Sequence, residues 1–407
     1  MLADVLANLE QARDTLIELQ RFLVATPALG PENGGQGERA KADALKAFFK
    51  KCGLPDPVEY NAPDDRVACG HRPNMTLVIP GQDTSRTFWI MSHMDVVPAG
   101  DRSLWNTDPF ELVVDGDELR GRGVEDNHHG LVFSVLLAKA LHETQTVPPI
   151  NLGLLLVADE ETGNRLGIKY LLENHAHLFK EEDLFLVPDS GDPDSRQIEV
   201  AEKGILWAKV TVHGKQCHAC RPCDGVNTLR AAASFITRID EVAEKFPDTD
   251  PLFTPPSSTF EPTKKEANVE NINTIPGRDV FYIDCRVLPH YKLDDVMVAL
   301  RALGDDVAKK HNVLIECDGS QKTEAAPVTP SDSEIVTRLM KAIQEENGAE
   351  PYVAGVGGGT VAAHLRHAGF PAVVWSSIYE NPHTPNERAN LRATLMDAKI
   401  AARILFA

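Results

Sequence analysis

The stretch Asn151-Leu-Gly-Leu-Leu-Leu-Val-Ala158 decides the fold class, because it is apolar almost throughout and three acidic residues follow it directly. An apolar run of this length is typical of a β-strand buried on both faces of a sheet. A helix is predicted before it over 128–142 and another after it over 166–173, and a further strand is predicted over 184–187. This alternation of strand and helix predicts an α/β fold with a mostly parallel sheet.

The pattern changes after Glu202, and 407 residues are too many for one ordinary core. The elements that follow have a β-α-β-β-α-β-like order, which is typical of a small ferredoxin-like α+β domain. They are strands at 205–212, 279–287 and 313–317 and helices at 226–245 and 292–311. The α/β pattern then resumes. We therefore expect one domain made of 1–202 and 323–407, with a second domain, 203–322, inserted into it.

The composition excludes several classes of partner. The formal net charge is −19 and no basic run is present, which argues against nucleic acid and anionic membrane surfaces. No apolar stretch is long enough to cross a bilayer, and the N-terminus lacks the pattern of a secretory signal. The seven cysteines do not indicate a disulfide scaffold, and reduced thiols fit the cytoplasmic location that we expect.

Three consecutive acids, Asp159-Glu160-Glu161, come directly after the buried strand. Such a cluster is costly because like charges repel and loss of solvent raises carboxyl pKa values. A metal cation would remove that cost: one glutamate could ligate it while its neighbour takes a proton from a water molecule. The alternative is an ordinary solvated acidic loop.

A second cluster, His93-Met94-Asp95, follows another predicted strand. The spacing lets Asp95 hold one ring nitrogen of His93 while the other nitrogen binds a metal. The alternative is a histidine–carboxylate pair that serves structure alone.

Three further segments supply metal-type ligands, each with a simpler alternative. Asp126 lies between glycines at a helix start and could be only a helix cap. Asp189 follows the strand at 184–187, but Asp-Ser-Gly is also good turn chemistry. His383 precedes the last helix and could mark only a helix entry. Together the five segments supply a balanced ligand set for two cations near the carboxyl ends of the strands, where open sheets place their sites.

These motifs resemble those of the metallopeptidases that include aminoacylase, acetylornithine deacetylase, succinyl-diaminopimelate desuccinylase and bacterial glutamate carboxypeptidase. The resemblance covers nearly the whole chain in the same order, and its most specific parts are His93-Met-Asp-Val-Val-Pro98, Gly121-Arg-Gly with Asp126, Asp159-Glu-Glu-Thr-Gly163 and the turn at His383. It implies a zinc-peptidase-like catalytic domain, an inserted lid or dimerisation domain, and two divalent metal ions. Zinc is expected, with cobalt or manganese as alternatives.

The resemblance also assigns roles to individual residues. Asp126 would bridge the two metals, His93 and Asp189 would complete one site, and Glu161 and His383 the other. Glu160 would be the general base and Asp95 would orient His93. In relatives the peptide bond after the bridging carboxylate is often cis, which here is the bond to Asn127.

In the inserted domain, His218 resembles a histidine that polarises the substrate carbonyl, often from the partner subunit; the alternative is a surface histidine on a hairpin. Arg286 is a candidate for binding a substrate carboxylate, or else it pairs with Asp284. The remaining substrate-binding candidates are Asn273 and the glycine-rich loop residues Gly358, Gly359 and Thr360.

Three departures from the family pattern stand out. His128-His129 replaces the lysine that commonly follows the bridging aspartate, and Val361 follows Thr360 where an aspartate is frequent. The third departure is the run Cys217, Cys220 and Cys223 around His218, which could hold a metal or an iron–sulfur centre or sense redox state. The simpler interpretation is small residues near a hairpin.

The resemblance implies a metal-dependent hydrolase that cleaves an amide bond next to a free carboxylate in a small molecule. N-acyl-amino-acid deacylation and dipeptide or carboxypeptidase cleavage are both open, and a non-catalytic binding relative is a further alternative. A homodimer through the inserted domain is expected.

Overall fold

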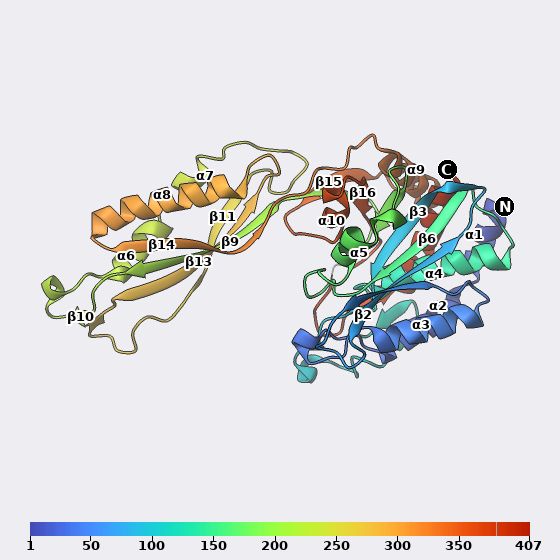
Figure 1. Ribbon diagram of the computed structural model, residues 1–407, viewed down its shortest axis with the longest axis horizontal. Coiled ribbons are helices and arrows are strands. Elements are labelled where there is room, and N and C mark those ends of the chain that lie inside the picture. The colour runs from blue at the N-terminus through green and yellow to red at the C-terminus, as the bar shows by residue number, and fades with distance from the viewer. Residues whose placement is uncertain (380) are drawn as a thin grey trace. The chain divides into compact units, whose positions relative to one another are not determined.

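The computed structural model describes residues 1–379 and 381–407, and the chain forms two compact units (Figure 1). The large unit comprises Met1–Val200, Thr329–Val353 and Thr360–Ala407. The inserted unit comprises Ala201–Val328 and Ala354–Gly359. Among the described residues, no helix is both long and apolar enough to span a membrane.

The large unit is built on an eight-stranded sheet with the order β1-β2-β6-β3-β7-β16-β8-β15. The central neighbours β6, β3, β7 and β16 run parallel, whereas β1, β2 and β8 pair antiparallel. The strands are β1 (Val58–Pro63), β2 (His71–Ile79), β3 (Asp83–His93), β6 (Ile150–Val157), β7 (Leu184–Val187), β8 (Gln197–Glu202), β15 (Tyr352–Val356) and β16 (Ala372–Val374). The α/β fold with a mostly parallel sheet is confirmed.

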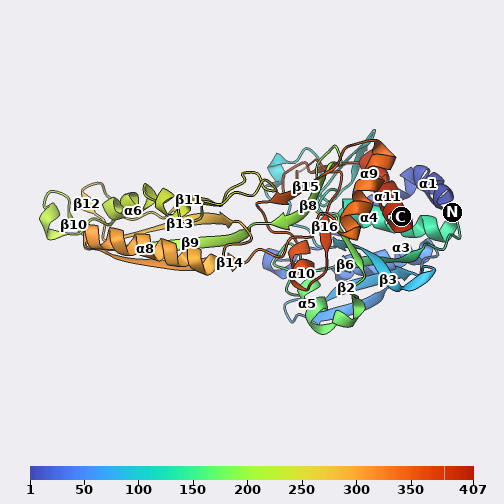
Figure 2. The same cartoon turned by 90° about the horizontal axis from the view of Figure 1, so that it is seen from above.

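Helices cover both faces of this sheet. In Figure 2, α5 and α10 lie on one side of the strands, and α4, α9 and α11 lie on the other. Thirteen of the 16 residues of α4 are buried, as expected for a helix that is apolar nearly all round. The helices of this unit are α1 (Leu2–Glu10), α2 (Arg13–Ala25), α3 (Arg39–Lys51), α4 (His128–Glu143), α5 (Ile168–Asn174), α9 (Glu334–Asn347), α10 (Ala362–His367) and α11 (Leu391–Phe406), with 3₁₀ turns η1 (Pro31–Asn33), η2 (Arg102–Leu104) and η3 (Ala176–Leu178).

A small sheet, ordered β17-β5-β4, joins two distant parts of the large unit. Its strands are β4 (Val113–Asp115), β5 (Glu118–Arg120) and β17 (Arg388–Asn390). β17 and β5 are antiparallel neighbours, and each adjoins a turn that carries candidate ligands.

The inserted unit has the element order β9-α6-β11-β13-α8-β14 and an antiparallel sheet ordered β11-β13-β9-β14. This is the β-α-β-β-α-β pattern expected of a ferredoxin-like domain, and β11 is the strand for which no range was predicted from the sequence. Figures 1 and 2 show α6 and α8 on the same face of the sheet, where Phe235 and Phe281 belong to a common core. The elements are β9 (Gly204–His213), β10 (Cys217–His218), η4 (Pro222–Asp224), α6 (Thr228–Ile236), α7 (Asp240–Ala243), β11 (Thr259–Lys265), β12 (Thr274–Ile275), β13 (Arg278–Val287), α8 (Leu293–His311) and β14 (Leu314–Thr323).

The single helix predicted over 226–245 is wrong, because α6 ends at Ile236 and α7 begins at Asp240. The hydroxyl of Thr237 donates to the backbone oxygens of Ala233 and Ser234, and the next amides bond three residues back instead of four. A local hydrogen bond of this kind competes with the regular helical ladder.

Candidate metal centre

The carboxyl ends of three parallel strands bring the candidate ligands to one edge of the large sheet. His93 is the last residue of β3 and lies opposite Val157, the last residue of β6. The acids Asp159-Glu160-Glu161 follow β6, and Asp189 lies two residues beyond β7. Parallel strands end on the same edge, so this arrangement follows from the sheet itself.

Two groups of three side chains offer ligand atoms that lie within 4.8 Å of one another, and Asp126 belongs to both. In the first group, Nε2 of His93 is 2.9 Å from Oδ1 of Asp126 and 3.4 Å from Oδ1 of Asp189. In the second, Nε2 of His383 is 3.2 Å from Oδ2 of Asp126 and 3.0 Å from Oε2 of Glu161. The two oxygens of Asp126 thus face different histidines.

The charges of this centre fit divalent cations. Burial and the nearby Asp189 carboxylate raise the pKa of Glu160 well above its usual range. Hydrogen bonds with Asp126 and Glu161 raise the pKa of His383 to about 10, so the surrounding acids favour positive charge there. Oε1 of Glu161 is buried without a hydrogen-bond partner among the described residues. A buried carboxylate oxygen left in this way is costly unless a cation or a donor satisfies it.

The structure rejects two simpler alternatives. The acids after β6 are not a solvated loop, because the side chains of Asp159 and Glu161 are only 4% and 6% exposed. Asp126 is not a helix cap either: Asn127 occupies that position before α4, without a side-chain cap bond. The peptide bond between Asp126 and Asn127 is cis, as the resemblance implied.

Asp95 holds two parts of the centre at once. Nδ1 of His93 is 2.9 Å from the backbone oxygen of Asp95 and 3.5 Å from its carboxylate, so the expected carboxylate contact is the longer of the two. The carboxylate instead accepts hydrogen bonds from the backbone N–H groups of Glu160, at 3.1 Å, and Glu161, at 3.0 Å. Asp95 therefore fixes the ring of His93 with its carbonyl and the acid pair with its side chain.

Several residues that hold the candidate ligands in place by hydrogen bonds were not predicted from the sequence. Nδ2 of Asn127 donates to Oδ1 of Asp189 at 2.6 Å and to the backbone oxygen of Pro188 at 2.7 Å. The buried carboxylates of Glu125 and Glu387 accept backbone hydrogen bonds from the two turns that carry Asp126 and His383. Glu125 and Glu387 lie beside motif residues, but nothing in their spacing distinguishes them from surface acids.

The inserted unit brings some of the remaining candidates together. β10 pairs with β12, so His218 lies opposite Thr274. The backbone N–H of Ala219 donates to the backbone oxygen of Asn273 at 2.8 Å. The backbone N–H of Cys220 donates to Nδ1 of His218 at 3.1 Å. Nδ1 is then an acceptor, so in the neutral ring Nε2 carries the hydrogen and can donate.

Arg286 forms the ion pair that the sequence left open as an alternative. Its Nε and Nη2 donate to the two carboxylate oxygens of Asp284 at 2.6 and 3.0 Å, and Nη1 donates to the backbone oxygen of Gly357 at 2.8 Å. Gly358 and Gly359 belong to the inserted unit, whereas Thr360 belongs to the large unit. Thr360 lies two residues before α10 and not at its first turn.

The cysteine run does not form a preformed metal site. Cys217, Cys220 and Cys223 are free thiols, and Cys220 and Cys223 are exposed. Within residues 1–379 and 381–407, the two groups that share Asp126 are the only sets of three ligands close enough to hold an ion.

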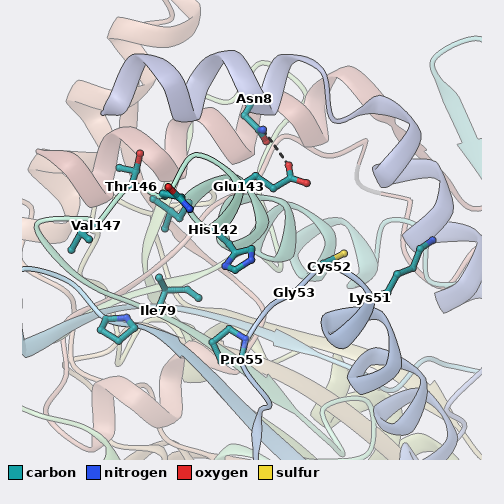
Figure 3. A pocket seen from close by; sticks show the side chains of 13 residues that line it. Asn8, Lys51, Cys52, Gly53, Pro55, Ile79, His142, Glu143, Thr146 and Val147 are labelled. Carbon is teal, nitrogen blue, oxygen red and sulfur yellow. Dashed lines mark hydrogen bonds between the residues drawn. The ribbon is translucent and has the colours of Figure 1, made fainter.

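A wide hollow of about 1040 Å³ lies elsewhere on the large unit (Figure 3). Asn8, Cys52, His142 and Glu143 line it, and Nδ2 of Asn8 donates to Glu143 at 3.2 Å. His142 and Glu143 end α4, whereas Asp126 precedes its start; at 1.5 Å per residue the two ends of this helix are about 24 Å apart. The hollow is therefore separate from the candidate metal centre.

Comparison with known proteins gives the same family as the motifs. A sequence model of peptidase family M20/M25/M40 matches residues 89–407. An uncharacterised metallohydrolase of Methanococcus maripaludis is 38% identical over 96% of this chain and 99% of its own length. A succinyl-diaminopimelate desuccinylase of Nitratiruptor is 27% identical over 92% of this chain and 94% of its own.

The fold has close counterparts among solved structures. Human carnosine dipeptidase 1 superposes with a TM-score of 0.75 at 16% identity, covering 100% of this chain and 98% of the dipeptidase. The sequence matches add the chemistry: the chain is a metallohydrolase that acts on amide or peptide bonds, and its relatives use divalent metals. The chain belongs to peptidase family M20/M25/M40.

Proposed function

We propose that this chain hydrolyses an amide bond next to a free carboxylate in a small molecule, using two divalent cations bound at the candidate metal centre. The observation that carries the proposal is the position of Asp126, whose two oxygens face His93 and His383 separately. His93 and Asp189 would complete one cation site, and Glu161 and His383 the other. Zinc is the expected ion, with cobalt or manganese as alternatives for a mixed histidine–carboxylate set.

Glu160 is the proposed general base. Bound cations would polarise the scissile carbonyl and make a water molecule acidic enough to give up a proton near neutral pH. Glu160 belongs to neither ligand group, so its carboxylate remains available to take that proton and return it to the leaving nitrogen. Nδ2 of Asn164 approaches this carboxylate only at a long distance of 3.4 Å, while Asp95 holds the backbone of Glu160.

The inserted domain, for which we propose the limits 203–322 and a lid or dimerisation role, supplies the other groups. We assign His218 to the substrate carbonyl oxygen, because Nε2–H is a donor suited to a developing negative charge. Arg286 keeps one N–H on each terminal nitrogen beyond its contacts with Asp284 and Gly357, which is enough to bind a carboxylate. We assign Asn273, Gly358, Gly359 and Thr360 to substrate binding on the resemblance alone.

Two substrate classes remain in competition. The relative named as a desuccinylase favours an N-acyl amino acid, and the structural neighbour named as a dipeptidase favours a dipeptide. A non-catalytic binding relative is disfavoured because the half-buried Glu160, which belongs to neither ligand group, would then have no use. We also propose a homodimer in the cytoplasm, where the seven free thiols fit a reducing environment.

Metal analysis combined with a substrate panel tests this function. The purified chain is stripped with a chelator, reloaded with Zn²⁺, Co²⁺ or Mn²⁺, and assayed against N-acyl amino acids and dipeptides. We expect two ions per chain and hydrolysis of one substrate class, with amidated carboxyl termini cleaved poorly. Two bound ions without hydrolysis of any panel member would favour the binding relative instead.

A further inference from the structure

Glu387 holds the turn that carries Asp126. Its side chain is fully buried, and Oε1 accepts hydrogen bonds from the backbone N–H groups of Glu125, at 2.9 Å, and Asp126, at 3.1 Å. Oε2 accepts from the N–H of Gly123, at 2.9 Å, and from Nη1 of Arg122, at 2.6 Å. All four of these partners are donors. A residue four positions after His383 thus fixes the backbone on which Asp126 stands.

Glu125, next to Asp126, holds the segment that carries His383. It is 3% exposed, and Oε2 accepts a hydrogen bond from the backbone N–H of Tyr379 at 2.7 Å. Oε1 accepts from the backbone N–H of Asn381, at 2.8 Å, and from its Nδ2, at 3.0 Å. A residue next to Asp126 thus fixes the backbone that leads into His383.

Backbone pairing extends this exchange. The backbone N–H of Gly121 donates to the backbone oxygen of Glu387 at 3.1 Å. Next to this bond, β5 and β17 form an antiparallel pair. The two segments are therefore tied at several points although more than 250 residues separate them. Each segment contributes one carboxylate to the other.

The second cation site, which includes His383, depends more on hydrogen bonds to its backbone than the first site, which includes His93. The side chain of His383 is 55% exposed, it stands on a turn with φ 62°, and it belongs to no helix or strand. His93, in contrast, is 2% exposed and ends a central strand. Neither Glu125 nor Glu387 contacts His93 or Asp189 in the hydrogen bonds of the described residues.

We propose that Glu125 and Glu387 form a reciprocal latch that positions His383 against Asp126 and so preorganises the second cation site. They are positioning residues: neither offers an atom to a ligand group. The inference rests on the proposed function, since it requires that two cations bind. Residues that orient metal ligands typically change metal affinity by about 10- to 100-fold when they are replaced.

Glu387→Gln and Glu125→Gln test the latch because they keep size and shape. In Glu387→Gln, either orientation of the new amide would point its NH₂ group at two donors, so hydrogen bonds are replaced by donor–donor contacts. Asp183→Asn is the matched control: Asp183 is also buried and accepts from the backbone N–H groups of Thr87 and Lys180 and from Nε1 of Trp89. It lies outside both cation groups.

The measurement is titration of each metal-free variant with Zn²⁺ alone against a competing chelator, with the Co²⁺ absorption spectrum as a second readout. In the unaltered chain we expect two binding events. Glu125→Gln, which acts on the segment that leads into His383, should weaken the second event by about 10- to 100-fold and the first by less than about 3-fold. Glu387→Gln also loosens Asp126, which both groups share, so it should weaken both events and the second by more. Asp183→Asn should change neither event, even if it lowers the melting temperature.

The outcomes separate the two proposals. A single event in the unaltered chain would count against the two-cation function, independently of the latch. Two events that stay unchanged in both latch variants, or that weaken equally, would overturn the latch. If one variant does not fold, the other carries the test; if neither folds, the pair serves the fold rather than the second site and the proposal is lost.

Discussion

The Nζ atom of Lys41 lies 2.7 Å from Nε2 of His128, and both side chains are buried. His128 belongs to the pair His128-His129, at which the resemblance implied a lysine shortly after the bridging aspartate. An amino group therefore reaches this region from α3 instead of from the start of α4. Burial lowers the pKa of His128 well below its usual range, so the ring beside the amine is neutral.

Lys41 should make stability depend on pH. Full burial lowers its pKa from 10.5 to about 7. Between these values the unfolded chain binds the proton and the folded chain does not, so the free energy of unfolding rises with pH. The free energy of unfolding rises by at most about 1.4 kcal/mol per pH unit. This gain is complete above the pKa of Lys41 in the unfolded chain and is lost as the pH falls through 7.

Denaturant unfolding at pH 7, 8 and 9 measures this contribution as the difference between the unaltered chain and Lys41→Met. We expect the difference to grow with pH in favour of the unaltered chain. Lys50→Met, on the exposed side of the same helix, should show no such trend. A difference that is flat across this range would mean that Lys41 stays charged when folded.

Glu160→Gln should lower kcat by about 10²- to 10⁴-fold, which is the usual contribution of a general base. Its metal content should be unchanged, because Glu160 lies in neither ligand group. Glu161→Gln is the contrasting variant and should lose one ion. Kinetics with elemental analysis of both variants checks the assignment; substantial turnover by Glu160→Gln would defeat it.

His218→Ala should lower kcat by about 10²- to 10³-fold, the loss typical of removing one donor to an oxyanion. Metal binding should be intact. Cys220→Ala is the control, because the hydrogen bond that leaves Nδ1 of His218 as an acceptor comes from the backbone N–H and survives the change. If Cys220→Ala alone reduces kcat as much as His218→Ala, the thiol run has a role that this assignment lacks.

The central part of the fold could be predicted because its strands are recognisable as short apolar runs in the sequence. The apolar run over 151–158 can be satisfied only by burial, and the acids after it must then lie at the sheet edge. β11 could not be predicted in the same way. Its sequence, Thr259-Phe-Glu-Pro-Thr-Lys-Lys265, contains a proline and two lysines, which a sheet tolerates at an edge strand with a bulge; the register shifts between Pro262 and Lys264.

The ligand candidates could be predicted from the sequence for the same reason, whereas the residues that support them could not. Glu161 and Asp189 follow strands whose ends are fixed by local pattern. Glu125 and Glu387 gain their contacts only when two turns meet across more than 250 residues. A carboxylate that accepts backbone N–H groups has no sequence signature, since any turn offers such donors.

Loss of the buried ion pair between Arg72 and Glu38 should destabilise the large unit strongly. Nε of Arg72 donates to Oε2 of Glu38 at 2.6 Å, and both side chains are 0% exposed. Oε1 of Glu38 also accepts from the backbone N–H of Asp159 at 3.2 Å, at the start of the acid turn. Arg72→Met leaves this carboxylate buried without its charge partner and should cost about 3–5 kcal/mol in denaturant unfolding.

Two comparisons test whether burial of the Arg72–Glu38 pair causes the loss of stability in Arg72→Met. Lys51→Met removes an ion pair with Glu18 in which the side chains are 62% and 53% exposed, and it should cost less than about 1 kcal/mol. Glu38→Gln combined with Arg72→Met should cost less than the sum of the single changes, because the charge of Glu38 is then removed together with that of its partner. Equal losses for Arg72→Met and Lys51→Met would show that the pair at Arg72 is no stronger than one at the surface.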